Sequence, residues 1–158
     1  MVHESVPVED PESLATLREV EQSLSRSLIA WSLASVGLGT ACAVAGSVQG
    51  RPAMVAFGRQ TVAWGAIDGL IAGAATMSQR RRGVLDRSAA RQQVQRVRRI
   101  LEINAVADIG YIAGGLLIAA RGRSGRRTAR MGTGDGVAIV LQGAFLLVLD
   151  TSQARRLR

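Results

Sequence analysis

Two aspartates interrupt long apolar stretches of the chain, and their carboxylates are the side chains best placed to do chemistry. Asp68 lies near the middle of residues 60–79 and Asp108 lies within residues 103–120, with no other charged residue in either stretch. A charged side chain in the middle of a membrane helix costs roughly 2.5 to 3.5 kcal/mol on insertion scales. Each carboxylate must therefore face other helices and find polar partners there, or carry a proton.

Other polar residues occur at positions from which they could accompany these aspartates. Asn104, Asp108 and Tyr111 lie at i, i+4 and i+7, which places them on one stripe of a helix. We expect an internal polar cluster made of Asp68, Asn104, Asp108, Tyr111 and Gln142. Two hypotheses for this cluster stay open: a proton or substrate site, and a hydrogen-bonded staple that fixes how the helices pack.

The residue content argues against most other chemistry. The single cysteine, Cys42, cannot form an intrachain disulfide, and the single histidine, His3, lies in the polar N-terminus. No nucleophile–base pair or metal-ligand cluster is apparent, and the glycine-rich residues 132–136 follow no strand, so we expect them to begin a helix. We therefore expect a protein that is not an enzyme and that holds no metal or cofactor.

Four apolar stretches are candidates for membrane spans. A helix rises about 1.5 Å per residue, so about 20 residues cross the hydrocarbon core of a bilayer. We expect an all-α, four-transmembrane-helix bundle over residues 11–153, between a flexible acidic N-terminus at 1–10 and a basic tail at 154–158. The expected spans are residues 27–48, 60–79, 103–120 and 131–153. The last is the weakest, since only 14 residues separate Asp135 from Asp150, both of which we expect near the head groups.

Two polar segments that precede spans have helical patterns of their own. Pro11 follows a possible capping aspartate, and leucines then recur at helical spacing toward the first span. Ala90, Val94, Val97 and Leu101 recur in the same way before the third span. We expect two short amphipathic helices at the cytoplasmic surface, and the acidic first segment could dock on the arginine-rich second one.

Arginines gather in blocks, which is typical of a membrane protein that crosses the bilayer several times. With both termini inside, 13 arginines fall on the cytoplasmic side and seven on the outer side. This predicts a multi-pass protein of the bacterial cytoplasmic (inner) membrane with both termini in the cytoplasm. The residues expected at anionic lipid head groups are Arg80, Arg81, Arg82, Arg98 and Arg99. The arginine run lacks interleaved aromatic residues, so we do not expect it to bind nucleic acid.

Small residues recur at four-residue spacing on two of the expected spans. Close approach of helix backbones in lipid requires such residues. The residues expected to pack helices are Gly65, Gly69, Gly73, Gly110 and Gly114. Packing within the bundle is the main interpretation, and a seam between two copies in a homo-oligomer is the alternative.

An internal repeat is suggested when the chain is shifted by 78 residues without gaps. The shift superposes Gly37 on Gly115, Gly58 on Gly136 and Gly65 on Gly143. Because it also superposes the first span on the third and the second on the fourth, it predicts a tandem duplication of a two-helix hairpin.

Three stretches of the chain resemble a known family. They are residues 64–69 (WGAIDG), 104–115 (NAVADIGYIAGG) and 132–150 (GTGDGVAIVLQGAFLLVLD). Together they resemble small bacterial four-helix integral membrane proteins classed as a domain of unknown function. The resemblance implies a location in the membrane and supplies no activity.

Two functions are compatible with these features. The first is a structural or interaction protein, such as an accessory subunit, whose polar cluster fixes helix packing. The alternative is a small proton-coupled transporter or channel that uses Asp68 and Asp108. A path that lets water reach the aspartates would favour the alternative.

Overall fold

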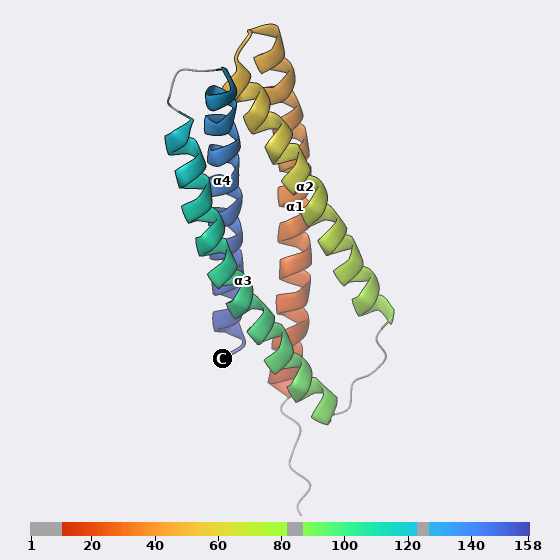
Figure 1. The fold of residues 1–158 in the computed structure, drawn as a ribbon. Coiled ribbons are helices and arrows are strands. Elements are labelled where there is room, and N and C mark those ends of the chain that lie inside the picture. Colours follow the sequence, from red (N-terminus) through yellow and green to blue (C-terminus); the bar gives the residue numbers. More distant parts are fainter. Residues whose placement is uncertain (1–10, 82–86, 123–126) are drawn as a thin grey trace, which may run out of the picture.

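The computed structural model describes residues 11–81, 87–122 and 127–158, which form four helices joined by short connections (Figure 1). The helices are α1 (Pro11–Val48), α2 (Pro52–Arg81), α3 (Arg87–Arg121) and α4 (Arg127–Arg156). The expected all-α, four-helix fold is therefore confirmed for this part of the chain. The expected flexible N-terminus at residues 1–10 and Arg82 lie outside the described residues.

The two amphipathic segments are continuous with the spans that follow them. α1 begins at Pro11 and runs for 38 residues, and α3 begins at Arg87 and runs for 35 residues. Neither glycine nor proline occurs between Pro11 and Gly37 or between Arg87 and Gly110, so nothing in the sequence interrupts the helix. The short helices expected from the sequence are thus the ends of longer ones.

A tight turn joins α1 to α2. Gly50 has a φ of 63°, a conformation that glycine adopts without steric cost. The Arg51 N–H donates to the Gly46 carbonyl at 2.8 Å, and the Gly50 N–H donates to the Ser47 carbonyl at 3.3 Å, which is the Schellman ending of a helix. Pro52 then opens α2, where its missing N–H costs nothing. The two helices form an antiparallel hairpin.

Close approach of glycines holds each hairpin together. A Cβ built on Gly39 would lie 2.8 Å from the Gly58 carbonyl oxygen, and one built on Gly115 would lie 2.8 Å from the Gly136 carbonyl oxygen. A Cβ on Gly58 would run into the backbone of Gly39 and Ala43, as one on Gly136 would run into that of Gly115 and Ala119. The α1–α2 and α3–α4 hairpins therefore make the same contacts.

These contacts correct the superposition used in the sequence comparison. Gly39 occupies the place in the first hairpin that Gly115 occupies in the second, whereas Gly37 has no neighbouring atom within 4 Å. The matching residues are thus 76 apart in α1 and α3 and 78 apart in α2 and α4. The difference arises because the chain that joins α3 to α4 is two residues longer than the one that joins α1 to α2.

The glycines expected to pack helices divide into two groups. Gly65 and Gly69 lie against Ser32 of α1, with a Cβ on Gly69 falling 2.7 Å from the serine hydroxyl. A Cβ on Gly73, Gly110 or Gly114 would meet no atom within 4 Å. These three glycines therefore do not hold the described bundle together.

The two hairpins meet along α2 and α4. Gly134 of α4 lies against the backbone of Ala53 and Phe57 in α2, so the helices touch where no side chain intervenes. Arg59 of α2 also attracts Asp135 of α4 electrostatically. α1 and α3 flank this central pair, each packed on its own hairpin partner.

A hydrophobic core closes the end of the bundle where the chain ends. Its members come from α1, α3 and the C-terminal residues: Leu17, Val20, Leu101, Ala154 and Leu157. Residues 154–158, which the sequence sets apart as a basic tail, thus continue α4 and contribute two buried side chains. The arginines beside them point outward, which is why the segment looks polar in sequence.

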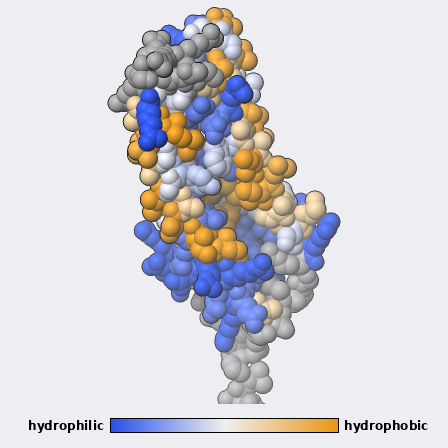
Figure 2. Space-filling model, viewed as in Figure 1, coloured by the Kyte–Doolittle hydropathy of each residue, from blue (hydrophilic) through white to orange (hydrophobic). Residues whose placement is uncertain are grey.

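Three of the described helices are long and apolar enough to cross a membrane: α1, α3 and α4. α4, the weakest span in the sequence, is among them, whereas α2 is not, because Arg59, Asp68 and many glycines and alanines lower its hydropathy. α2 nevertheless packs along α1 and presents Leu70 outward, 75 % exposed. Large apolar side chains are exposed to a similar extent on the other helices: Leu33, Val106 and Val148. In Figure 2 hydrophobic surface lies over the middle of the molecule and hydrophilic surface gathers toward the lower end.

The glycine contacts yield a prediction that two neighbouring residues can test. Gly115→Ala places a methyl group against the Gly136 carbonyl, and such overpacking typically costs about 1–3 kcal/mol. We expect a clearly lower Tm of the purified protein in mild detergent. Gly114→Ala is the matched control: its Cβ meets nothing within 4 Å, so the Tm should stay unchanged or rise. Equal Tm values for the two variants would contradict the close packing of α3 on α4.

Candidate functional site

A chain of hydrogen bonds crosses the middle of the bundle. The Trp31 indole N–H of α1 donates to the Gln142 side-chain oxygen of α4 at 2.7 Å, and the Gln142 amide nitrogen donates to Asp68 Oδ2 of α2 at 2.6 Å. Asp68 is 2 % exposed and Gln142 is 4 % exposed. The side-chain amide thus uses both its donor and its acceptor to link three helices, away from solvent and lipid.

Aromatic stacking orients the tryptophan of this network. The Trp31 ring stacks on Phe145 with the ring centroids 4.0 Å apart and an angle of 6° between the planes. Phe145 follows Gln142 by three residues on α4, so one face of that helix offers both the ring and the amide oxygen. The sequence predicts Asp68 and Gln142, whose burial demands partners. It does not single out Trp31, because a tryptophan in a span is equally suited to the membrane interface.

Asp108 lies in a different environment from Asp68. Its side chain is 3 % exposed, yet its Oδ2 has no hydrogen-bond partner among the described residues. The Trp64 indole N–H is the other buried polar group without a partner in this part of the chain. A buried polar atom that forms no hydrogen bond loses about 1–3 kcal/mol of stability, so these two atoms are exceptions that call for a physical reason.

Tyr111 and Asn104 share the helical stripe of Asp108 but take different partners. The Tyr111 ring packs edge-on against Trp64, with the centroids 5.4 Å apart. The Asn104 side chain hydrogen-bonds to Asp150 of α4. The five residues of the expected cluster therefore do not form one connected group: Asp68 and Gln142 bond to each other, Tyr111 contacts Trp64, and Asn104 pairs with Asp150.

Asp150 is a buried carboxylate that the sequence places at the head groups instead. It is 6 % exposed, on the last turns of α4. Asp68 repels Asp108 electrostatically, and Asp108 repels Asp150, so the three carboxylates form a row from the middle of the bundle toward one end. Its position at the edge of the apolar run hid this residue, since α4 continues without interruption to Arg156.

A cavity of about 500 Å³ leads to the outer end of this row. All four helices line it, and its inner part is formed by Leu28, Ile71, Ile100, Asn104 and Asp150. Residues nearer the helix ends make its outer part: Glu21, Gln79, Gln93 and Arg96. The walls are mainly apolar, and the carboxylate of Asp150 lies where the cavity is deepest along the helices.

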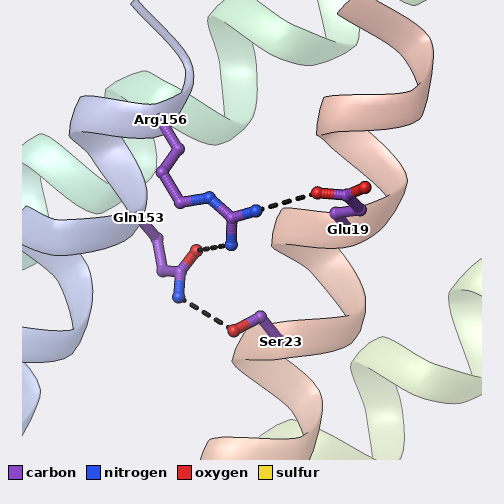
Figure 3. Close-up of polar contacts among 4 residues, drawn as sticks. All are labelled: Glu19, Ser23, Gln153 and Arg156. Atoms are coloured by element: carbon purple, nitrogen blue, oxygen red, sulfur yellow. Dashed lines mark hydrogen bonds and ion pairs between the residues drawn. The ribbon is translucent and has the colours of Figure 1, made fainter. Parts of the chain in front are cut away.

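Polar contacts tie α4 to α1 beside the outer end of the cavity (Figure 3). Arg156 forms an ion pair with Glu19 at 2.9 Å, and the Gln153 amide nitrogen donates to the Ser23 hydroxyl at 3.0 Å. Exposed ion pairs contribute less than about 1 kcal/mol. The apolar core of Leu17 and Leu157 thus supplies most of the stability here, and the polar contacts fix the orientation of the helices.

The arginines assigned to lipid head groups lie at helix ends. Arg80 and Arg81 are exposed in the last turn of α2, and Arg99 is exposed on α3. Arg98 forms an ion pair with Glu102 at 2.9 Å on the same helix. The acidic first segment does approach the second one, because the Gln93 amide lies 3.4 Å from Glu21. Within the described residues, no group of three His, Cys, Asp or Glu side chains could hold a metal ion.

Comparison with known proteins gives one match. The model of a family of unknown function, DUF6992, matches residues 27–151, which include the hydrogen-bond chain and all three buried carboxylates. No curated protein and no solved structure matches the chain.

The hydrogen-bond chain predicts different effects for two substitutions. Gln142→Leu leaves both the Trp31 N–H and Asp68 without partners, and each unsatisfied group costs about 1–3 kcal/mol. We expect a markedly lower Tm in detergent. Asp68→Asn should change the Tm little, because the asparagine oxygen still accepts from Gln142. A Gln142→Leu protein as stable as the original would mean that the chain of bonds does not hold the three helices.

Proposed function

Since the chain belongs to DUF6992, a family of unknown function, we propose a function from its own residues: a small membrane protein that transports protons. Asp108 and Asp150 would be the groups that take up and release the proton. One observation carries the proposal, namely the buried Asp108 oxygen that has no hydrogen-bond partner among the described residues.

The contrast between Asp68 and Asp108 supports this assignment. A carboxylate that serves only to fix packing gains stability by satisfying its oxygens, as Asp68 does with Gln142. Asp108 lowers stability instead, because it is buried beside two other carboxylates and lacks a bond at Oδ2. Intramembrane carboxylates that persist at such a cost are typical of proton relays.

The position of the cavity supports a direction of entry. The cavity reaches Asp150 from the end of the bundle where α2 finishes and α3 begins. Asp150 interacts with Asp108, and Asp108 interacts with Asp68, which lies near the middle of α2. Protons that reach Asp150 through the cavity would thus pass to Asp108 by short steps between neighbouring carboxyl groups.

A structural or accessory role is the second candidate. The hydrogen bonds from Trp31 through Gln142 to Asp68 favour it, because they join three helices and leave no polar atom for a ligand. Under this hypothesis Asp108 would serve packing alone, and its replacement by asparagine would leave every activity of the protein intact. The two candidates therefore differ in what they require of one carboxyl proton.

We also infer that the two hairpins arose by duplication. The matching glycine contacts at Gly39 and Gly115, and at Gly58 and Gly136, support this inference. So does the agreement of both pairs with constant offsets of 76 and 78 residues, which a single two-residue difference in the connection explains. Relatives that retain the second pair of glycines but carry bulky residues at the first would contradict it.

We propose a cytoplasmic location for both termini, in the inner membrane of a bacterium. The arginine distribution of 13 against seven supports it, as does the packing of Leu17 and Leu157 at one end of the bundle. A reporter fused after Arg158 should score as cytoplasmic, and one inserted at Gly50 should score as external. A reporter at Arg158 that scores as external would contradict the proposed topology. The exposed Arg80, Arg81 and Arg99 would then face anionic lipid head groups of the inner leaflet.

The transport proposal predicts the effect of removing one titratable group. In proteoliposomes, a potassium diffusion potential should drive protons inward, as followed by a pH-sensitive dye in the lumen. Asp108→Asn keeps the shape of the side chain but cannot carry the proton, so proton entry should fall to the rate of empty liposomes. Asp135→Asn, which lies outside the row of carboxylates, should retain the original rate.

Two results would contradict the proposal. One is an original protein that conducts no faster than empty liposomes. The other is an Asp108→Asn protein that conducts like the original. The Tm of each variant in detergent shows whether a loss of proton entry reflects a loss of folding.

A further inference from the structure

The chemistry of the cavity identifies a class of ligand. We propose that the cavity between α1, α2 and α3 binds an amphiphilic organic cation, with its charged group near Asp150 and its apolar body against the helix walls. This inference deepens the proposed function and rests on it, since it names the substrate class that would share the carboxylate site with the proton.

The walls of the cavity set the size and polarity of the ligand. A volume of about 500 Å³ lies within the range of pockets that enclose drug-sized molecules. Leu24 and Leu28 line it from α1, Ile71 lines it from α2, and Ile100 and Leu101 line it from α3. A small hydrated ion would leave these apolar side chains exposed to water, so the walls fit a ligand with a substantial hydrocarbon portion.

The charges along the cavity set the sign of the ligand. Asp150 lies at the inner end with 6 % of its surface exposed, and Asp108 beside it adds a second negative charge. The cationic side chain that lines the cavity, Arg96, is one to two turns away from Asn104 along α3, nearer the outer end. An anion would therefore enter against two carboxylates, and a neutral apolar molecule would leave Asp150 uncompensated.

The polar partners at the inner end leave a place for one charged group. Asn104 hydrogen-bonds to Asp150 and lines the cavity with it. A carboxylate has two oxygens that together accept several hydrogen bonds or contact a cation, so one amide does not saturate it. An ammonium or phosphonium group at this position would lie next to Asp150 while its substituents contact Ile71 and Leu28.

Binding can be measured without any transport. The full chain, purified in an uncharged detergent, is dialysed to equilibrium against tetraphenylphosphonium and, separately, against tetraphenylborate. These two ions have nearly the same size and shape and opposite charge. We expect saturable binding of one tetraphenylphosphonium per chain, and only unsaturable partitioning of tetraphenylborate into the detergent.

Two neighbouring alanines of α2 provide a matched pair of variants. Ala75 lines the cavity, whereas Ala74 is exposed on the outer face of the same helix. Ala75→Phe fills part of the cavity and should weaken tetraphenylphosphonium binding at least tenfold, while Ala74→Phe should leave it unchanged. Asp150→Asn should also weaken binding at least tenfold, provided that its Tm shows it to be folded. The Ala75→Phe result decides the location even if Asp150→Asn does not fold.

The outcomes separate this inference from the transport proposal. Saturable binding of both ions would mean that the cavity is an apolar site, such as one for a lipid chain, and would overturn the cation proposal. Equal binding by the Ala75→Phe and Ala74→Phe proteins would overturn the location. Binding of the cation by a protein that moves no protons would contradict transport but leave the ligand class intact. Proton entry without saturable cation binding would do the reverse.

Discussion

Close approach of glycine backbones is the constraint on which the rest of this structure depends. Lipid tails are as apolar as leucine, so membrane helices gain little from burying apolar surface and associate through tight packing instead. In both hairpins a glycine on one helix meets the backbone carbonyl of a glycine on the other, where no side chain fits. This packing fixes the depth of each helix and thereby the height at which Asp68 and Asp108 lie. A shift of one residue would turn either carboxylate toward lipid.

The polar interior combines two arrangements with opposite energetic character. Around Gln142, each side-chain polar atom has a partner, and the stacked rings of Trp31 and Phe145 hold the geometry. Around Asp108, carboxylates lie near one another, and one oxygen has no partner in the described part of the chain. The first arrangement stabilises the bundle, and the second draws on that stability. Bonded groups that join three helices can support a neighbouring site that is not itself satisfied.

The sequence predicts much of this fold and part of the site, for identifiable physical reasons. Four helices follow from apolar length, and the pairing of Asp68 with Gln142 follows because both must be buried and satisfied. The position of Asp150 could not be predicted, since a carboxylate at the end of an apolar run is equally stable at the head groups. Gly39 was missed because the match to Gly115 requires a difference in loop length that an ungapped comparison excludes. The cavity depends on how α2 and α3 diverge, which no local pattern of residues records.

Equivalent positions in the two hairpins carry different side chains, and this difference confines the chemistry to a few residues. The backbone oxygen beside Gly65 belongs to Ser32, and the one beside Gly143 belongs to Asp108. The two residues thus occupy the same place in their hairpins, yet one carries a small hydroxyl and the other a carboxylate. Since the shared glycine contacts suffice to build both hairpins, packing alone does not require a carboxylate at this position. The acid at residue 108 therefore has to be explained by what it does in the interior, beyond how the helices are held.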